Sequence, residues 1–473
     1  MKQYISLVFI CAITILNSCN LDIVPADEIA GEDAIDNVAT ARDAINSAYL
    51  LYPKSNMTFS ILAEDFFPTY LISRNEDLNL LYKWDAQQIK LESDNLWRTY
   101  YSTIRSINSL LASEKYIKIN KEAELQEWNK IKGEAYALKA MAYFDLLNIY
   151  SLIEDKTEPG IVLKDKIELE YLPRSSTEAC LIEIKRLLNE ASILLIANAA
   201  EEKRILTKSQ YYLGYYASTL MSAKVALSEQ DYASAKKYCE IIITDIGYKN
   251  NKADATAYYN LWTNEDTEEK LFSFDNQTFI LSRHIDNIQN GDYFAIPSSF
   301  DYEDNDVRKG IASIEFEMKA NGYAELVKRN LIGKYRTGVT DYSPKNINWL
   351  RLPEAYFILS ECYAESNNLE KAISTINIFL SKRGVSQISR NIDKPTFLKK
   401  LFFEKQKEFH GEGLNFFEMK RLRKDIKRYK LEDESTQSTI LKNDHRMLFP
   451  IPLTELKNNP NMTQNVGWDN IVK

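Results

Sequence analysis

Small and large apolar residues recur at the same intervals in two distant parts of the 473-residue chain, and this repeat constrains the fold more than any other feature. The matched positions are Ala223, Ala226, Ala235, Cys239 and Ile242 in one copy and Ser360, Tyr363, Ala372, Ile376 and Phe379 in the other. Intervals of three and four residues are typical of one face of a helix. The longest interval crosses a polar turn, 228–231 or 365–368. Each copy therefore predicts two helices that meet at their small residues.

This register is similar to that of a tetratricopeptide helix pair. Residues 133–150 place apolar side chains around most of a helix, which must then be packed on several sides. Only 14 Gly and 12 Pro occur, which argues against a Gly-rich β-sandwich. We expect a mostly α-helical fold, an α-α superhelix of tetratricopeptide-like pairs over about 30–246 and 349–430.

The helical period fades from about residue 247 to 348, where Tyr, Asn, Asp and Gly become frequent. Within this stretch, 270–274 predicts a short strand. A loop-rich insertion of this length between helical repeats is typical of a ligand-binding segment. A second irregular stretch is predicted at 52–94, and residues 446–473 are expected to be extended.

Residues 1–18 have the layout of a secretory signal peptide, with Lys2 before an apolar run at 5–16. That run is too short to span a bilayer, which needs about 20 residues. It ends in Leu16-Asn17-Ser18-Cys19, which resembles a bacterial lipobox. We expect lipidation of Cys19, since two or more acyl chains anchor a protein stably. The mature chain would then be a single domain, 19–473.

The charge balance, 59 Lys+Arg against 67 Asp+Glu, argues against a nucleic-acid partner, because phosphate binding normally needs a basic stripe. The basic cluster at 420–430 is predicted to be a solvated helix face. The later cysteines, Cys180, Cys239 and Cys362, lie in helical patterns far apart and are predicted to be buried free thiols.

Several motifs, in order along the chain, resemble the SusD/RagB family of Bacteroidetes outer-membrane lipoproteins. After the lipobox come Trp97-Arg98-x-Tyr100 with Asn108, the helix 133–146, and Arg351-Leu352-Pro353-Glu354-Ala355-Tyr356. The C-terminal motifs are Glu408-Phe409-His410-Gly411-Glu412-Gly413, Phe449-Pro450-Ile451-Pro452 and Gly467-Trp468. The chain departs from the usual family pattern at Lys405, Asn415 and Glu418, positions that we interpret as structural.

The resemblance implies a lipid-anchored protein on the extracellular side of the cell outer membrane. Such proteins bind a glycan without chemistry and act as a lid over a SusC-like TonB-dependent barrel. The partners implied are therefore that barrel, the glycan and the outer-membrane lipid. No cofactor is implied. A second hypothesis keeps this architecture and changes the ligand to a peptide or another nutrient.

A surface glycoside hydrolase is the alternative of a different class, because it needs two carboxylates held across a cleft. Glu404, Glu408 and Glu412 share one helical face, and we interpret them as salt-bridging or turn-holding residues. The three histidines, His284, His410 and His445, have no partner at metal-ligand spacing. We therefore expect neither catalysis nor a metal site.

Sugar rings stack on aromatic side chains, while polar side chains bind their hydroxyls. The irregular segments contain side chains of both kinds. The predicted ligand-binding residues are Arg74, Asp77, Tyr82 and Trp84 in the first segment and Trp262, Tyr293, Tyr302 and Asp304 in the insertion. Aromatic residues at helical spacing, such as Tyr143 and Tyr356, are expected in the core.

Overall fold

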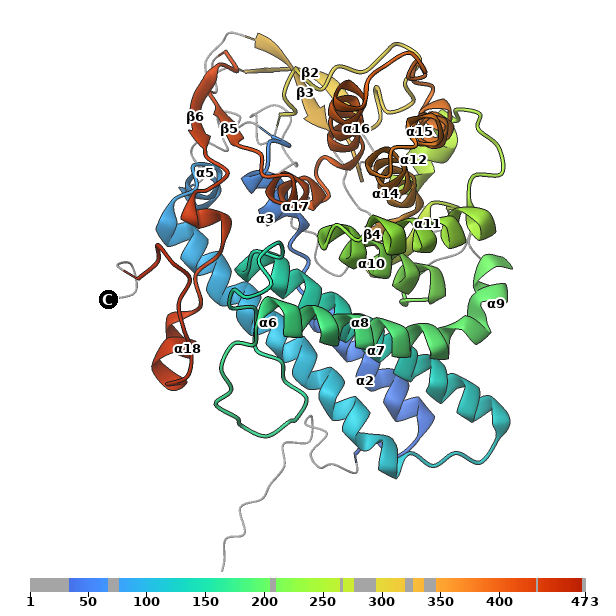
Figure 1. The fold of residues 1–473 in the computed structure, drawn as a ribbon, viewed down its shortest axis with the longest axis vertical. Helices are drawn as coiled ribbons and strands as arrows, with labels where there is room; N and C mark the ends of the chain where they lie inside the picture. Colours follow the sequence, from blue (N-terminus) through green and yellow to red (C-terminus); the bar gives the residue numbers. More distant parts are fainter. Residues whose placement is uncertain are drawn as a thin grey trace, which may run out of the picture.

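The computed structural model describes residues 34–66, 76–204, 210–263, 267–275, 295–319, 326–335, 346–430 and 433–469. Four long helices of the first half pack against one another (Figure 1). They are α2 (Val38–Leu51), α6 (Ala86–Ala112), α7 (Glu122–Tyr150) and α8 (Thr177–Leu195). The apolar stretch at 133–150 is the second half of α7 and is buried on nearly every side, as its pattern predicts.

Short helices join these long ones. They are α3 (Asn56–Leu62), α5 (Glu76–Tyr82), η1 (Ser113–Tyr116), η2 (Ile196–Asn198) and α9 (Ala199–Arg204). The stretch predicted to be irregular at 52–94 thus contains α3, α5 and the start of α6, so that prediction was wrong in its extent. The reason is local: Asp85 caps α6 by accepting hydrogen bonds from the backbone nitrogens of Gln87 and Gln88, which starts the helix before Trp97.

The internal repeat forms two helix pairs, as predicted. They are α10 (Tyr215–Ser228) with α11 (Tyr232–Ile246) and α14 (Leu352–Glu365) with α15 (Leu369–Arg383). Both turns have the same geometry, with a left-handed residue at Gln230 (φ 60°) and at Asn367 (φ 59°). The next residue, Asp231 or Asn368, caps the second helix. Because α11 also packs on α14, the pairs form a continuous helical stack, which confirms the mostly α-helical class.

The insertion is closed at its base by a two-stranded antiparallel sheet. Strand β1 (Lys270–Asp275) pairs with β4 (Asn346–Arg351), and Arg351 leads directly into α14. The strand predicted at 270–274 is therefore confirmed. Between them lies the β2 (Ser313–Lys319) and β3 (Leu326–Ile332) ladder, while helix α12 (Ala255–Thr263) precedes β1. In Figure 1 β2 and β3 lie at the end of the molecule away from the α2–α6–α7 bundle. The β1–β4 sheet instead reaches the bundle, where Phe272 and Trp349 pack on Tyr49 and Tyr52 at the C-terminal end of α2.

The C-terminal part packs back over both halves. It comprises α16 (Lys394–Phe409), α17 (Leu414–Arg421), β5 (Ile426–Tyr429), β6 (Thr436–Ile440), η5 (His445–Met447) and α18 (Leu453–Asn458). The last segment, predicted to be extended, therefore includes the short helix α18. The three cysteines Cys180, Cys239 and Cys362 are free and buried, as predicted.

The basic cluster at 420–430 is not a solvated helix face, so that prediction was wrong. Helix α17 ends at Arg421, and strand β5 follows. The buried guanidinium of Arg428 donates hydrogen bonds to the carbonyl oxygens of Ile61 (2.8 Å) and Leu62 (3.2 Å), at the end of α3. A cation here meets carbonyl groups that the helix leaves unpaired. The buried position of this arginine therefore results from a tertiary contact with α3, not from a solvated helix face.

Two glycines provide a matched test of how α15 meets the insertion. Gly384 (φ +73°) ends α15, and a Cβ there would lie 2.2 Å from the carbonyl oxygen of Asn305. Gly310 (φ +78°) has open space around a Cβ. We expect Gly310→Ala to lower the free energy of unfolding by about 1 kcal/mol, from backbone strain alone. Gly384→Ala should cost about 2–3 kcal/mol, because the helix end must also move off the insertion.

Urea denaturation followed by circular dichroism measures both variants. Equal losses would contradict the close contact between Gly384 and Asn305.

Among the described residues, no helix is long and apolar enough to cross a membrane.

Candidate ligand-binding surface

Four of the eight predicted ligand-binding residues are buried in the core. Trp84 is 0% exposed, Tyr82 1%, Trp262 2% and Tyr302 6%. A ring with no exposed face cannot stack on a sugar in this conformation, so the structure assigns these four rings a packing role. Large rings in segments without helical period can still be covered by distant elements, which the local pattern does not reveal.

Their contacts explain the burial. The indole nitrogen of Trp84 donates a hydrogen bond to the carbonyl oxygen of Leu62 at 3.1 Å. The Trp262 ring lies beside the Lys334 ammonium and the Arg351 guanidinium, 4.7 and 5.2 Å from its centre. Cation–π contacts of this kind stabilise buried cations.

The remaining predicted residues differ in position. Asp77 is exposed in the first turn of α5. Asp304 is exposed in the insertion and pairs with Lys309 at 2.6 Å. Arg74 and Tyr293 lie outside the described residues. The described candidates are therefore not brought together in one exposed cluster.

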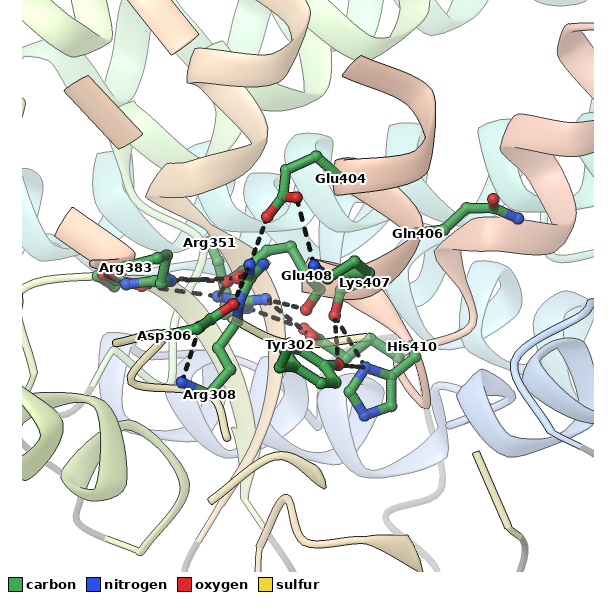
Figure 2. A network of polar contacts seen from close by, with 12 residues as sticks. Tyr302, Asp306, Arg308, Arg351, Arg383, Glu404, Gln406, Lys407, Glu408 and His410 are labelled. Atoms are coloured by element: carbon green, nitrogen blue, oxygen red, sulfur yellow. Dashed lines mark hydrogen bonds and ion pairs between the residues drawn. The ribbon is translucent and has the colours of Figure 1, made fainter. Parts of the chain in front are cut away.

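The three glutamates of α16 and its following turn lie in a buried ion-pair network with four cations from other elements. Figure 2 shows the part of this network around Glu404, Glu408 and the three arginines. Glu408 contacts Arg351 and Arg383 at 2.8 Å each and Arg308 at 3.3 Å. Glu412 contacts Arg351 and Lys334, both at 2.7 Å, and Glu404 contacts Arg308. The predicted salt-bridging role of these glutamates is confirmed.

Each arginine of this network also has a second carboxylate. Arg308 binds Asp306 at 2.7 Å, and Arg383 binds Glu269 at 2.7 Å.

Burial alone would raise the pKa of Glu408, but the neighbouring arginines hold it well below its ordinary value. A general acid needs the opposite shift, so Glu408 does not suit the general-acid role in glycoside hydrolysis. The network joins the insertion, β4, α15 and α16 into one body.

An open groove with a volume of about 680 Å³ runs along α6. We call it the α6 groove. Five of the α6 residues that line it recur at intervals of three and four and so share one face: Leu91, Asp94, Arg98, Tyr101 and Arg105. Leu169 and Glu455 line its other side. Exposed leucines at its edge, Leu91 (62%) and Leu169 (80%), supply apolar surface beside the charged groups.

The polar groups of the α6 groove include one that is incompletely paired. One carboxylate oxygen of Asp94 is buried and has no hydrogen-bond partner among the described residues. Burial raises the pKa of Asp94, while Lys90 and Arg98 act to lower it. Arg98 and Arg105 are exposed and can donate hydrogen bonds to a ligand. A mixture of apolar contact and hydrogen-bonding groups suits a hydroxyl-rich ligand.

The sequence pattern did not predict this groove, because residues 97–108 resemble a scaffold helix and ligand-binding residues were expected in irregular segments. The signal was present: two arginines and a tyrosine on one helical face beside an acidic residue. What the pattern could not supply is the opposite wall, since Leu169 and Glu455 come from distant parts of the chain. Among the described residues, no group of three His, Cys, Asp or Glu side chains could hold a metal ion.

Solved structures share this fold. A SusD-like carbohydrate binding protein from Bacteroides vulgatus ATCC 8482 has a TM-score of 0.73 at 18% identity, covering 90% of this chain and 97% of its own. A SusD superfamily protein from Bacteroides thetaiotaomicron VPI-5482 has a TM-score of 0.72 at 20% identity, covering 91% and 99%. Another, from Bacteroides vulgatus ATCC 8482, has 0.73 at 22%, covering 91% and 99%.

Family models also match the sequence. The model described as starch-binding associating with outer membrane matches residues 21–212. The SusD family model matches residues 206–468, more than half of the chain. No curated protein matches this chain. The two matches follow one another along the chain and support carbohydrate binding and outer-membrane association at the level of the family. With the helical stack and the C-terminal motifs described above, they establish that the chain belongs to the SusD family.

Proposed function

We propose that this protein captures a glycan at the cell surface and delivers it, without catalysis, to a SusC-like TonB-dependent transporter over which it acts as a lid. The observation that carries this proposal is the family match, which runs from residue 21 to residue 468 in two consecutive parts. The ion pairs of Glu408 with three arginines support a role without catalysis, because this carboxylate is already occupied within the protein.

The α6 groove is the described surface that best suits a glycan. Its apolar edge would contact the C–H faces of sugar rings, and Arg98, Arg105 and Asp94 would bind hydroxyl groups. Asp77 and Asp304 are exposed and remain proposed ligand contacts.

Isothermal calorimetry against a panel of polysaccharides and a peptide digest tests the proposal, using the full chain with Cys19→Ala to prevent lipidation. We expect saturable binding of one polysaccharide. The double variant Arg98→Ala and Arg105→Ala should weaken that binding about tenfold or more, because each guanidinium donates charge-assisted hydrogen bonds. A matched control, Arg186→Ala with Arg390→Ala, removes the same charge from exposed positions outside the groove and should bind normally.

Tight binding of peptides with none to any polysaccharide would overturn the glycan assignment. Equal weakening in both double variants would indicate a nonspecific charge effect and would remove the α6 groove from the proposal.

The lipid anchor has its own test. We propose that acyl chains on Cys19 hold the protein at the outer membrane, facing the extracellular side. Cell fractionation should recover the unchanged protein with the outer membrane and Cys19→Ala in the soluble fraction. Replacement of the internal cysteine Cys239 by Ala serves as the control and should leave the protein in the membrane fraction. Retention of Cys19→Ala in the membrane would exclude this anchor.

A further inference from the structure

A second hollow, which we call the inner pocket, lies between α3, α7, α10, α14 and α17 and has a volume of about 120 Å³. One water needs roughly 10–15 Å³ of such volume, so the pocket has room for several waters or for one small organic molecule. Two residues of its wall, Glu154 and Gln230, are exposed, so the pocket reaches the surface beside the α10–α11 turn. A small ligand could therefore enter without unfolding of the protein.

Two residues on the wall of the inner pocket carry buried polar atoms that lack a partner. The side-chain nitrogen of Asn56 donates no hydrogen bond, and one carboxylate oxygen of Glu354 accepts none, among the described residues. Both residues are only 4% exposed. A buried polar atom without a partner is costly, so these two atoms call for a molecule in the pocket. That molecule must accept a hydrogen bond at one point and donate one at another, as hydroxyl groups do.

The charges on the wall of the inner pocket are largely compensated within the protein. Lys224 pairs with the other oxygen of Glu354 at 2.8 Å, and Lys405 pairs with Glu418 at 3.0 Å. Burial raises the pKa of Asp145 to about 6, although hydrogen bonds from the hydroxyl groups of Tyr52 and Tyr100 and the nearby Lys224 act to lower it. Because these charges are paired or hydrogen-bonded within the protein, a neutral ligand fits the pocket better than an ion.

Aromatic rings make up much of the remaining wall. Phe59, Phe144, Trp349 and Phe417 line the inner pocket, and the ring of Trp349 is only partly buried. Such a wall favours a ligand with apolar C–H faces as well as hydroxyl groups.

We propose that the inner pocket binds one small neutral polyhydroxy molecule, the size of a single sugar unit, through Asn56 and Glu354. The choice of a sugar as the ligand rests on the proposed function, whereas the unpaired atoms and the aromatic wall do not. The inner pocket is distinct from the α6 groove, since no residue lines both.

Calorimetry and ligand-observed NMR with simple hexoses and their N-acetyl derivatives test this inference, again with the full chain carrying Cys19→Ala. We expect saturable binding of one monosaccharide. The variant Asn56→Leu should weaken it about tenfold or more, because the donor is lost while the side-chain volume is kept. Among the described residues the Asn56 nitrogen has no partner, so the loss of this donor breaks no hydrogen bond between them.

The control is Asn46→Leu, which removes another buried unpaired amide atom, one that does not line the inner pocket. It should bind the monosaccharide as the unchanged protein does. Absence of monosaccharide binding, or equal binding by Asn56→Leu, would overturn the inference, as would a crystal soaked with the sugar that holds only water in the pocket.

The polysaccharide assay separates this inference from the proposed function. If the protein binds a polysaccharide but no monosaccharide, the inner-pocket site fails alone. If it binds a monosaccharide at the inner pocket but no polysaccharide, the proposed surface capture fails alone.

Discussion

Replacing Glu408 with alanine is expected to lower the free energy of unfolding by about 3–5 kcal/mol, the range found when one partner of a buried ion pair is removed. Glu408 is 0% exposed and contacts three arginines. The loss should not be three times larger, because each arginine keeps another carboxylate: Arg308 keeps Asp306, Arg351 keeps Glu412, and Arg383 keeps Glu269.

Urea denaturation at neutral pH measures this loss. The matched control is Glu370→Ala, which removes a carboxylate from a pair with Arg390 in which both side chains are 76% exposed. Exposed pairs contribute little, so the control should change the unfolding energy by less than about 1 kcal/mol. A loss for Glu408→Ala no greater than that of the control would show that the network adds no stability.

The same variant has a pH signature. The native pKa of Glu408 lies below its ordinary value of 4.5, so the native state binds fewer protons at this site than the unfolded state does. Stability from Glu408 is therefore fully present above about pH 4.5 and is lost as pH falls toward the native pKa. The difference in unfolding energy between the unchanged protein and Glu408→Ala should shrink on acidification below pH 4.5. A difference that stays constant would contradict the ion-pair origin.

Replacing Trp84 with alanine is expected to lower the free energy of unfolding by about 3–5 kcal/mol, because it leaves a large cavity in a packed core. Trp84 is 0% exposed, and its ring lies near Phe416. The carbonyl oxygen of Leu62, which loses the indole hydrogen bond, still accepts one from Arg428 at 3.2 Å. The expected loss is therefore one of packing rather than of an unpaired carbonyl.

Asp77→Ala is the matched control, since Asp77 was predicted to bind ligand in the same segment but is exposed. It should leave the unfolding energy within about 0.5 kcal/mol. Urea denaturation again provides the measurement. If Trp84→Ala were as stable as the control and lost glycan binding instead, the ring would have to be accessible in solution, contrary to its burial.

The helix pairs were predictable because their signal is local. The intervals that join Ala223 to Ile242 and Ser360 to Phe379 place small residues on facing helices, whatever the rest of the chain does. The polar turns between them adopt the same left-handed geometry at Gln230 and Asn367, although neither residue is a glycine. A shared backbone shape at matched positions supports the repeat that the side-chain pattern predicted.

The partners of α16 were only half predictable. The spacing of Glu404, Glu408 and Glu412 places three carboxylates on one face and favours ion pairs. Their partners Arg308 and Arg351 come from the insertion and its closing strand. No local pattern links residues so far apart, so only the folded structure identifies them.

By itself, the sequence determined the helical class, the paired repeat, strand β1 of the insertion and the motifs of the SusD family, because each depends on residues close together in the chain. The tertiary structure decided which side chains are exposed. It buried Trp84 and Trp262, directed Arg428 to the end of α3, and formed the α6 groove and the inner pocket from distant segments. Exposure depends on what packs against a residue from elsewhere, which periodicity does not contain.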